Sequence, residues 1–238
     1  MEIQIRQTDP TFLGVDTNLD SIQVFCVDID AIYDPSESCY PDILSKDEMN
    51  KADRFFHIRD RASFLVRKYC LRVLLSKITS RKPSDLLFNT IANRKPVIEG
   101  QEFNASHSGK YAMIAISSAP VGIDIEEIDQ TFDFEGVVKR CFTKDEQKAL
   151  ECHEDKQNFF RLWTRKEATL KASGEGLTND LHLLNCVPNR ILRNGRYYEL
   201  TTFYPETNYV VTIASELNTS KILFWKISPE IQEQTAGN

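Results

Sequence analysis

The pattern of hydrophobic and polar positions predicts the same order of secondary-structure elements twice along this chain. The segment 21–32, SIQVFCVDIDAI, is mostly apolar and rich in β-branched residues, which predicts a strand. Ser45 and Glu48 then stand three residues apart at the start of a helical pattern, the spacing of a capping box. Apolar residues at helical spacing continue to Ile78. The first part of the chain therefore predicts a strand, a capped helix and a long helix.

The second part repeats this order. Val121–Ile128 predicts a strand, Thr143 and Glu146 form a second capping box, and the long helix lies in FRLWTRKEATLKASGEGL, which begins at Phe160. When the sequence is aligned with itself at an offset of 98 residues, SKDE aligns with TKDE, and the pair Arg67-Lys68 aligns with Arg165-Lys166 without a gap. A repeated order of this kind is typical of a duplicated unit.

We therefore predict an α+β fold of two similar halves with a pseudo-twofold relation. Each half is an antiparallel sheet packed against a long helix, and the halves comprise residues 1–118 and 119–238. The late segments RYYELTTFYPETNYVVTIASE and KILFWKI are predicted to complete the second sheet. A cleft between such halves is a common place for a ligand.

Composition narrows the function classes. Of the 238 residues, 41% are hydrophobic, so the chain has enough apolar residues for a core, and its net charge of −6 argues against a nucleic-acid or membrane-surface protein. The six cysteines form no C-x-x-C pair, and Cys152-His153 lacks a second pair for a zinc site. With no signal-like start and no apolar run near 20 residues, we expect a reduced, cytoplasmic protein.

The strand VGIDIEE carries two acids on one face. Since strand residues alternate, Val121, Ile123 and Ile125 share the core face, and Asp124 and Glu126 stand side by side with Gly122 on the other. Neighbouring carboxylates repel unless a cation or water separates them, and hard oxygen ligands suit Mg²⁺. The alternative is an ordinary solvated face, while the glycine leaves room for another backbone or a ligand.

Along one face of the long helix, the side chains change from aromatic to charged. Phe160, Trp163, Glu167 and Lys171 follow helical spacing, so the row runs from aromatic to charged, and Gly174 then ends the helix. An exposed Glu–Lys pair is one interpretation. The other is a helix whose first turns lie in a core and whose last turns line a cleft. Glu167 is then a third oxygen ligand or a general base, and Lys171 holds a phosphate.

A polar segment precedes the apolar strand 111–116. In FNASHSG, Ser106, His107 and Ser108 supply hydroxyls and an imidazole suited to an anion, and Lys95 places a cation in an earlier turn. A plain polar turn is the alternative. A hydrolase pair of Ser106 and His107 is disfavoured because the sequence holds no G-x-S-x-G elbow.

Taken together, RKP (residues 94–96), FNASHSG (103–109), VGIDIE (121–126) and FRLWTRKEATLKASGEGL (160–177) resemble the Sfp-type 4′-phosphopantetheinyl transferases of the holo-carrier-protein synthase superfamily. The resemblance covers most of the chain in the right order. It implies an enzyme with two similar halves that moves the phosphopantetheine arm of coenzyme A onto a serine of an apo acyl or peptidyl carrier protein. The implied reaction requires Mg²⁺ and releases adenosine 3′,5′-bisphosphate.

The resemblance also implies roles for individual residues. The metal carboxylates are Asp124, Glu126 and Glu167, the catalytic residues are Glu167 and Lys171, and the coenzyme A contacts are Lys51, Lys95, Ser106 and His107. His107 corresponds to a histidine at the nucleotide 3′-phosphate. Glu48 and Phe64 depart from the family pattern, which has a lysine and a threonine there, and Arg61 and Arg67 are alternative substitutes for the missing contacts.

Two expectations concern partners. Carriers of this class are usually acidic, so a basic surface of Arg161, Arg165 and Lys166, or a part of the first half, is expected to attract one. A monomer suffices if both halves lie in one chain. The rival functions are a Mg²⁺-dependent pyrophosphohydrolase that uses water in place of serine, and a carrier-binding module without catalysis.

Overall fold

The computed structural model describes residues 3–7, 21–88, 98, 100–151, 156–176, 180–216 and 221–227. Lys95 and Cys152 lie outside these ranges, so the predictions made for them stay predictions. The two capping boxes are confirmed: Ser45 and Glu48 exchange side-chain and backbone hydrogen bonds at the start of α2 (Lys46–Ala52), and Thr143 and Glu146 do so at α5 (Lys144–Glu151).

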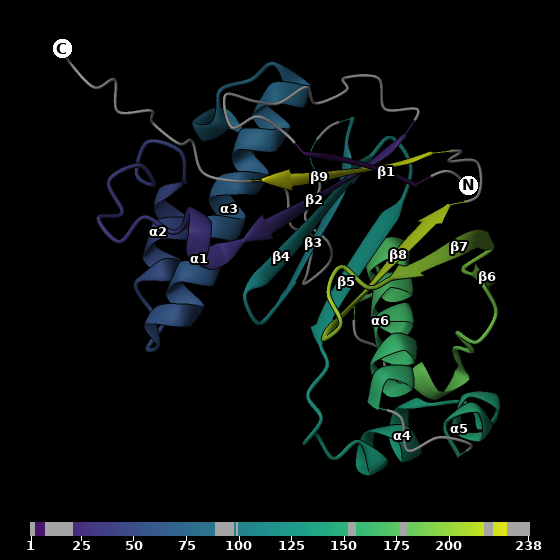
Figure 1. Cartoon of the computed structure of the whole chain (residues 1–238). Coiled ribbons are helices and arrows are strands. Elements are labelled where there is room, and N and C mark those ends of the chain that lie inside the picture. Colours follow the sequence, from purple (N-terminus) through teal and green to yellow (C-terminus); the bar gives the residue numbers. More distant parts are fainter. Residues whose placement is uncertain are drawn as a thin grey trace.

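The fold is a mixed α+β arrangement in which each sheet has its own long helix (Figure 1). The first sheet lies beside α3 (Ile58–Thr79) and the second beside α6 (Lys156–Ser173). Short helices complete the described elements: α1 (Ile29–Ile32), α4 (Glu135–Cys141) and the 3₁₀ turns η1 (Pro83–Asp85) and η2 (Leu181–Leu183).

Within the described residues, the first sheet has five strands in the order β1-β9-β2-β4-β3. Their bounds are β1 (Ile3–Gln7), β2 (Ile22–Asp28), β3 (Glu102–Ser108), β4 (Tyr111–Ser117) and β9 (Ile222–Ile227). The prediction that KILFWKI completes the second sheet is wrong, because β9 lies between β1 and β2 and runs parallel to both. The first sheet is therefore mixed rather than antiparallel. Side chains of β9 supply apolar contacts to its core, which the local pattern could not assign to either sheet.

The second sheet is antiparallel, with the described strands in the order β5-β8-β7-β6. Their bounds are β5 (Val121–Glu127), β6 (Arg190–Arg193), β7 (Arg196–Phe203) and β8 (Tyr209–Glu216). Three strands of each sheet are paired alike: β2 pairs with β4 as β5 pairs with β8, and β3 pairs with β4 as β7 pairs with β8.

The two sheets pack together through an apolar layer. Ile22 and Val24 of β2 meet the core face of β5 there, where Val121, Ile123 and Ile125 are buried as their alternation predicts. On the polar side, β3 is bound to β5 through side chains: Asn104 Oδ1 accepts the Ile123 amide at 2.9 Å, and Ser108 Oγ accepts the Glu127 amide at 2.9 Å. No helix in the described part of the chain is long and apolar enough to span a bilayer.

Candidate active site

Gly122 brings the acidic strand against the long helix. A Cβ atom at this position would lie 2.1 Å from the Ala168 carbonyl oxygen and 2.5 Å from the Ala172 amide nitrogen, both in the backbone of α6. A glycine is therefore required here so that β5 and α6 can approach closely. The sequence left open whether a backbone or a ligand fills this space, and the structure shows that a helix does.

Asp124 is buried at this contact and bound to two side chains. Its carboxylate is 3% exposed, so the interpretation of a solvated acidic face is wrong. Lys171 Nζ lies 2.6 Å from Oδ1, and Ser106 Oγ donates a hydrogen bond to the same oxygen at 2.7 Å. Lys171 Nζ also donates to Ser106 Oγ at 3.0 Å. Side chains from β3, β5 and α6 thus converge on one carboxylate oxygen.

The negative charge of Asp124 raises the pKa values of both Glu126 and Glu167. The pKa of Glu126 is raised to about 7, first by burial and then by the negative charge of Asp124, with a smaller contribution from Glu167, while a hydrogen bond that Ser108 Oγ donates at 3.0 Å opposes this. The pKa of Glu167 is also raised, first by burial and then by Asp124. Three carboxyl groups therefore share one partly desolvated region, which is unfavourable unless positive charge enters it.

The arrangement suits a divalent cation bound through oxygen. Asp124 Oδ2 is buried and makes no hydrogen bond within the described structure, so it is available as a ligand. Among the described residues, no three His, Cys, Asp or Glu side chains are gathered into a ready metal cluster. The unpartnered Oδ2 of Asp124 and the nearby Glu126 and Glu167 carboxyl groups could each supply a ligand to an ion that also takes oxygens from substrate and water.

The segment FNASHSG is part of a strand, so the alternative of a plain polar turn is wrong for residues 103–108. It forms β3 and turns into β4 at Gly109, whose φ of 55° lies in the left-handed region. Because alternate residues point to opposite faces, Ser106 faces the acids and His107 faces α3. The pKa of His107 is lowered to about 4, first by burial of its ring and then by the positive charges of Arg67 and Lys171.

A small basic cavity of about 290 Å³ lies between α2, α3 and β3. Its lining includes Lys51, Arg67 and Lys68 together with the Phe64 ring, and the Lys51 and Lys68 ammonium groups lie 5.5 Å and 6.0 Å from the ring centroid. Burial lowers the pKa of both Arg67 and Lys68, although the Glu48 carboxylate 3.5 Å from Lys68 raises the pKa of that lysine in part. Desolvated cations of this kind attract an anion.

The structure explains the departure from the family pattern at Glu48 and distinguishes the two alternative substitutes, Arg61 and Arg67. Glu48 closes the α2 capping box and also pairs with Arg72 at 2.7 Å, so it stabilises the first half. Arg61 is bound to Glu37 at 2.6 Å and to Asp53 at 2.8 Å, which leaves it poorly suited to replace a nucleotide contact. Arg67 donates Nε to the Ser63 carbonyl and has no acidic partner among the described residues. The structure therefore favours Arg67 over Arg61.

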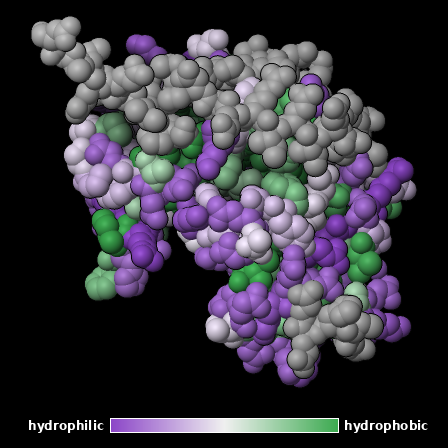
Figure 2. All heavy atoms as spheres, viewed as in Figure 1, coloured by the Kyte–Doolittle hydropathy of each residue, from purple (hydrophilic) through white to green (hydrophobic). Residues whose placement is uncertain are grey.

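A larger cavity of about 680 Å³ opens beside His107. One wall comes from the start of α3, including Ile58 and Arg59, and the other from the β3–β4 turn and the facing ends of β5 and β8. Figure 2 shows the molecular surface hollowed between the lobe that carries α2 and α3 and the lobe of the second sheet. Ser108 lines this cavity and donates to Glu126, which connects the cavity to the acidic site.

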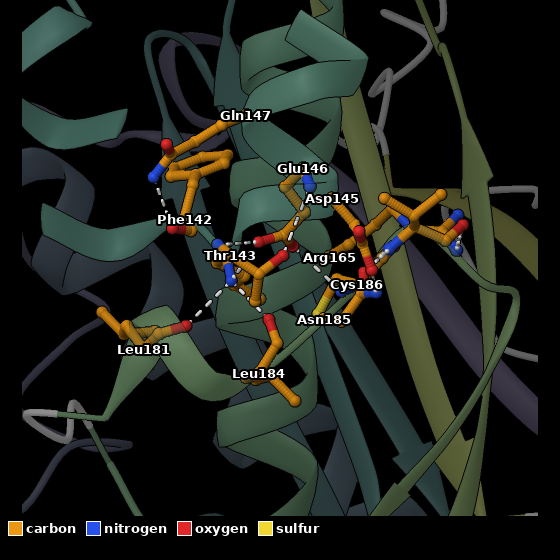
Figure 3. A network of polar contacts seen from close by, with 12 residues as sticks. Phe142, Thr143, Asp145, Glu146, Gln147, Arg165, Leu181, Leu184, Asn185 and Cys186 are labelled. Carbon is orange, nitrogen blue, oxygen red and sulfur yellow. Dashed lines mark hydrogen bonds and ion pairs between the residues drawn. The ribbon is translucent and has the colours of Figure 1, made fainter. Parts of the chain in front are cut away.

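Of the three cations predicted to form a basic surface on the long helix, Arg165 and Lys166 are buried, whereas Arg161 is partly exposed and donates to Asn158 Oδ1 at 3.0 Å and 2.7 Å. Lys166 is 0% exposed and lies 2.7 Å from Glu146, and its ammonium group donates to the Leu181 and Leu184 carbonyls. Arg165 is also buried and donates to the Cys186 carbonyl at 2.6 Å (Figure 3). It also donates to the Pro188 carbonyl at 2.6 Å. These two cations bind the segment 181–189 to α6. The prediction failed for these two because their carbonyl partners come from a segment that helical spacing does not reveal.

One site residue, Asn104, was missed from the sequence, and Ser108, which the sequence offered as an anion ligand, has a different contact. Asn104 and Ser108 bind the β5 backbone, and together with Ser106 they form an alternating N-x-S-x-S pattern on one face of β3. Read as a strand, this period of two would have identified Asn104.

Comparison with known proteins places these features in one family. Residues 120–214 match the 4′-phosphopantetheinyl transferase superfamily, and residues 34–119 match 4′-phosphopantetheinyl transferase, N-terminal. The 4′-phosphopantetheinyl transferase HetI of Nostoc sp. is 32% identical over 185 residues, which is 72% of this chain and 78% of that protein. The 4′-phosphopantetheinyl transferase Sfp of Bacillus subtilis is 33% identical over 57% of this chain and 62% of that protein. A putative 4′-phosphopantetheinyl transferase of Synechocystis sp. is 31% identical over 66% of this chain and 67% of that protein.

The chain therefore belongs to the 4′-phosphopantetheinyl transferases and is of the Sfp type, as its motifs predict. It is an enzyme with phosphopantetheinyl transferase activity, and its family uses coenzyme A and acts on carrier proteins.

Proposed function

We propose that this enzyme transfers the 4′-phosphopantetheine moiety of coenzyme A to a serine of an apo acyl or peptidyl carrier protein and releases adenosine 3′,5′-bisphosphate. The observation that carries this proposal is the convergence of Lys171, Ser106 and Asp124, with Glu126 and Glu167 close by, at the junction of the two sheets. A site with several carboxylates and one lysine suits transfer of an anionic phosphoryl group.

The proposed ion is Mg²⁺, held by Asp124, Glu126 and Glu167. The free Oδ2 of Asp124 and the mutual repulsion of the three carboxylates support this choice. When bound, the ion would neutralise charge on the diphosphate of coenzyme A.

The proposed transfer step gives separate roles to Glu167 and Lys171. The serine oxygen attacks the β-phosphorus, the bond from that phosphorus to the bridging oxygen breaks, and the electron pair stays on the leaving 5′-phosphate. Glu167, whose pKa is raised, accepts the serine proton. Lys171, already held beside Asp124, stabilises negative charge on the diphosphate.

The nucleotide end of coenzyme A is proposed to bind to the first half. His107 and the cations Lys51, Arg67 and Lys68 supply positive charge and hydrogen-bond donors for the 3′-phosphate. Lys95 is proposed as a further contact from its sequence motif. Ser106 lies between this group and the acidic site, so it can bind the diphosphate while it holds Asp124.

We also propose two halves, 1–118 and 119–238, related by a pseudo-twofold axis with the active-site cleft between them. The shared strand pairing supports this division, although β9 crosses to the first sheet. A repeated ion pair supports it as well. Glu48 lies 3.5 Å from Lys68, and Glu146 lies 2.7 Å from Lys166, so each capping-box glutamate pairs with a lysine 20 residues later.

A cytoplasmic monomer is proposed as the working form. The five described cysteines, Cys26, Cys39, Cys70, Cys141 and Cys186, all carry free thiols, as a reducing compartment favours. Both sets of site residues come from one chain, so the site needs no second copy.

Intact mass spectrometry of apo carriers tests the proposed reaction. Fatty-acid, polyketide and peptide carriers are each incubated with the enzyme, coenzyme A and Mg²⁺, and a control omits the enzyme. We expect at least one carrier to gain the mass of one phosphopantetheine. Cleavage of coenzyme A at the same rate without any carrier would instead indicate a pyrophosphohydrolase.

A further inference from the structure

The junction between α2 and α3 exposes two large apolar side chains. Phe56 is 94% exposed and Ile58 is 64% exposed, whereas the neighbouring Phe55 packs inward against Phe64 with ring centroids 5.4 Å apart. Phe55 therefore fixes the backbone of the junction, and the next residues point outward. Figure 2 shows hydrophobic groups among hydrophilic ones at the tip of this lobe. Exposed apolar groups on a firm backbone are typical of an interaction surface.

Two cations flank these side chains. Arg54 and Arg59 are exposed, and neither forms an ion pair with another residue in the described part of the chain. Asp53 does not neutralise Arg54, because its carboxylate binds Arg61 at 2.8 Å. Asp60 offsets part of this charge. A positive patch in a chain of net charge −6 favours an acidic partner.

The patch borders the cavity that leads to the proposed site. Ile58 and Arg59 line the cavity of about 680 Å³ together with His107, Ser108 and Gly109. A protein seated on the α2–α3 junction would therefore lie over this opening. This is the position that a partner needs in order to present a side chain to the acidic site, which Ser108 reaches through Glu126.

We propose that Arg54, Phe56, Ile58 and Arg59 form the docking surface for the acidic apo carrier protein. This inference rests on the proposed function, since it names where that reaction's protein substrate binds. The arginines attract the acidic carrier, and the two apolar side chains are buried in the complex. Docking is thus assigned to the first half and not to the buried cations of α6.

Steady-state kinetics of two double variants test this surface. We use the carrier that the wild-type enzyme modifies fastest in the mass-spectrometry panel. Phe56→Ser with Ile58→Ser should raise the KM for this carrier about tenfold, because apolar anchors dominate such interfaces. Arg54→Glu with Arg59→Glu should raise it by a similar factor and flatten its dependence on salt. The KM for coenzyme A and the kcat should stay within about twofold of wild type in both variants.

Matched controls come from the second half. Leu192→Ser removes an exposed apolar side chain from β6, and Lys148→Glu reverses an exposed charge on α5. Both should leave the KM for the carrier unchanged. Circular dichroism and the urea midpoint should be unchanged in all variants, since every substituted side chain is exposed.

The outcomes separate this inference from the proposed function. If the wild type modifies no carrier, the proposed function fails before docking is tested. If the wild type is active and both double variants keep the wild-type KM for the carrier, the docking surface is wrong. An equal rise in the KM for coenzyme A would also overturn the docking surface. The surface would instead be a contact between two copies of the chain if the wild type is a dimer and Phe56→Ser dissociates it without changing the KM for the carrier.

Discussion

The ammonium group of Lys171 lies 2.6 Å from Oδ1 of Asp124, across the contact between α6 and β5. Ser106 donates to the same oxygen, while Oδ2 of Asp124 stays buried without a partner in the described structure. One oxygen is therefore held by the protein, and the other is free to bind the proposed cation. This relationship joins the two sequence motifs VGIDIE and FRLWTRKEATLKASGEGL in one site.

Asp124→Asn keeps the shape of the side chain and removes its charge. We expect kcat/KM for transfer to fall about 100-fold or more, because Lys171 loses its partner and the cation loses a ligand. Intact mass spectrometry of the carrier over a range of Mg²⁺ concentrations measures this loss. Glu135→Gln, at the exposed start of α4, is the control. A near-normal rate at the wild-type Mg²⁺ optimum would remove Asp124 from the site.

Gly122→Ala should destabilise the protein severely. The added methyl group would lie 2.1 Å from the Ala168 carbonyl oxygen, and backbone atoms on both sides resist movement. We expect a loss of about 3 kcal/mol or more in the free energy of unfolding, measured by urea denaturation. Gly136→Ala in α4 is the control, since an added methyl group there would meet no atom within 4 Å, and it should be neutral or slightly stabilising. Equal stability of the two variants would contradict the close approach of β5 and α6.

Lys166→Met should cost more stability than Lys68→Met. Lys166 and Glu146 are both fully buried, so removing one charge leaves the other uncompensated, at a cost of about 3–5 kcal/mol. Lys68 is partly exposed at 3.5 Å from Glu48, and its loss should cost about 1 kcal/mol or less. Urea denaturation of both variants measures the difference. Similar costs would mean that the two halves use the repeated pair in the same way.

Binding of coenzyme A should be linked to protonation of His107. Because the pKa of His107 is lowered to about 4, the ring is neutral near neutral pH, and a 3′-phosphate beside it would raise that pKa. The complex then binds more protons than the free enzyme, so affinity rises as the pH falls through the pKa of the ring in the complex toward about 4. Calorimetry in buffers of different ionisation enthalpy should detect proton uptake.

Two controls isolate this effect. Proton uptake on binding of coenzyme A should be smaller in His107→Ala than in the wild type. It should also be smaller when the wild type binds dephospho-coenzyme A, which lacks the 3′-phosphate. The mutant and the wild type should then differ little on dephospho-coenzyme A. An equal loss of affinity for both ligands would contradict the contact between His107 and the 3′-phosphate.

Local patterns predicted the elements that depend on neighbours in sequence. The capping boxes at Ser45 and Thr143, the buried face of β5 and the end of α6 before Gly174 all follow from short-range spacing, and the structure confirms them. The approach of Asp124 and Lys171 was inferred from family motifs, because no periodicity relates residues on different elements.

Contacts between residues far apart in the chain could not be predicted from local sequence patterns. β9 joins the first sheet because its partners lie near the other end of the chain, and no local signal distinguishes the two sheets. Lys166 and Arg165 are charged and were therefore expected on the surface, yet the carbonyls of residues 181–188 and the carboxylate of Glu146 satisfy them inside. Burial of a charge depends on partners that only the fold supplies.

The most direct test of the central claim is a single-turnover experiment on Glu167→Gln. Coenzyme A is first bound to enzyme in Mg²⁺ and its affinity measured by calorimetry, and apo carrier is then added and its mass followed in time. If Glu167 accepts the serine proton beside Asp124, the variant should bind coenzyme A nearly as well as wild type but transfer phosphopantetheine about 100-fold more slowly. Transfer at the wild-type rate, or a loss confined to binding, would contradict the account.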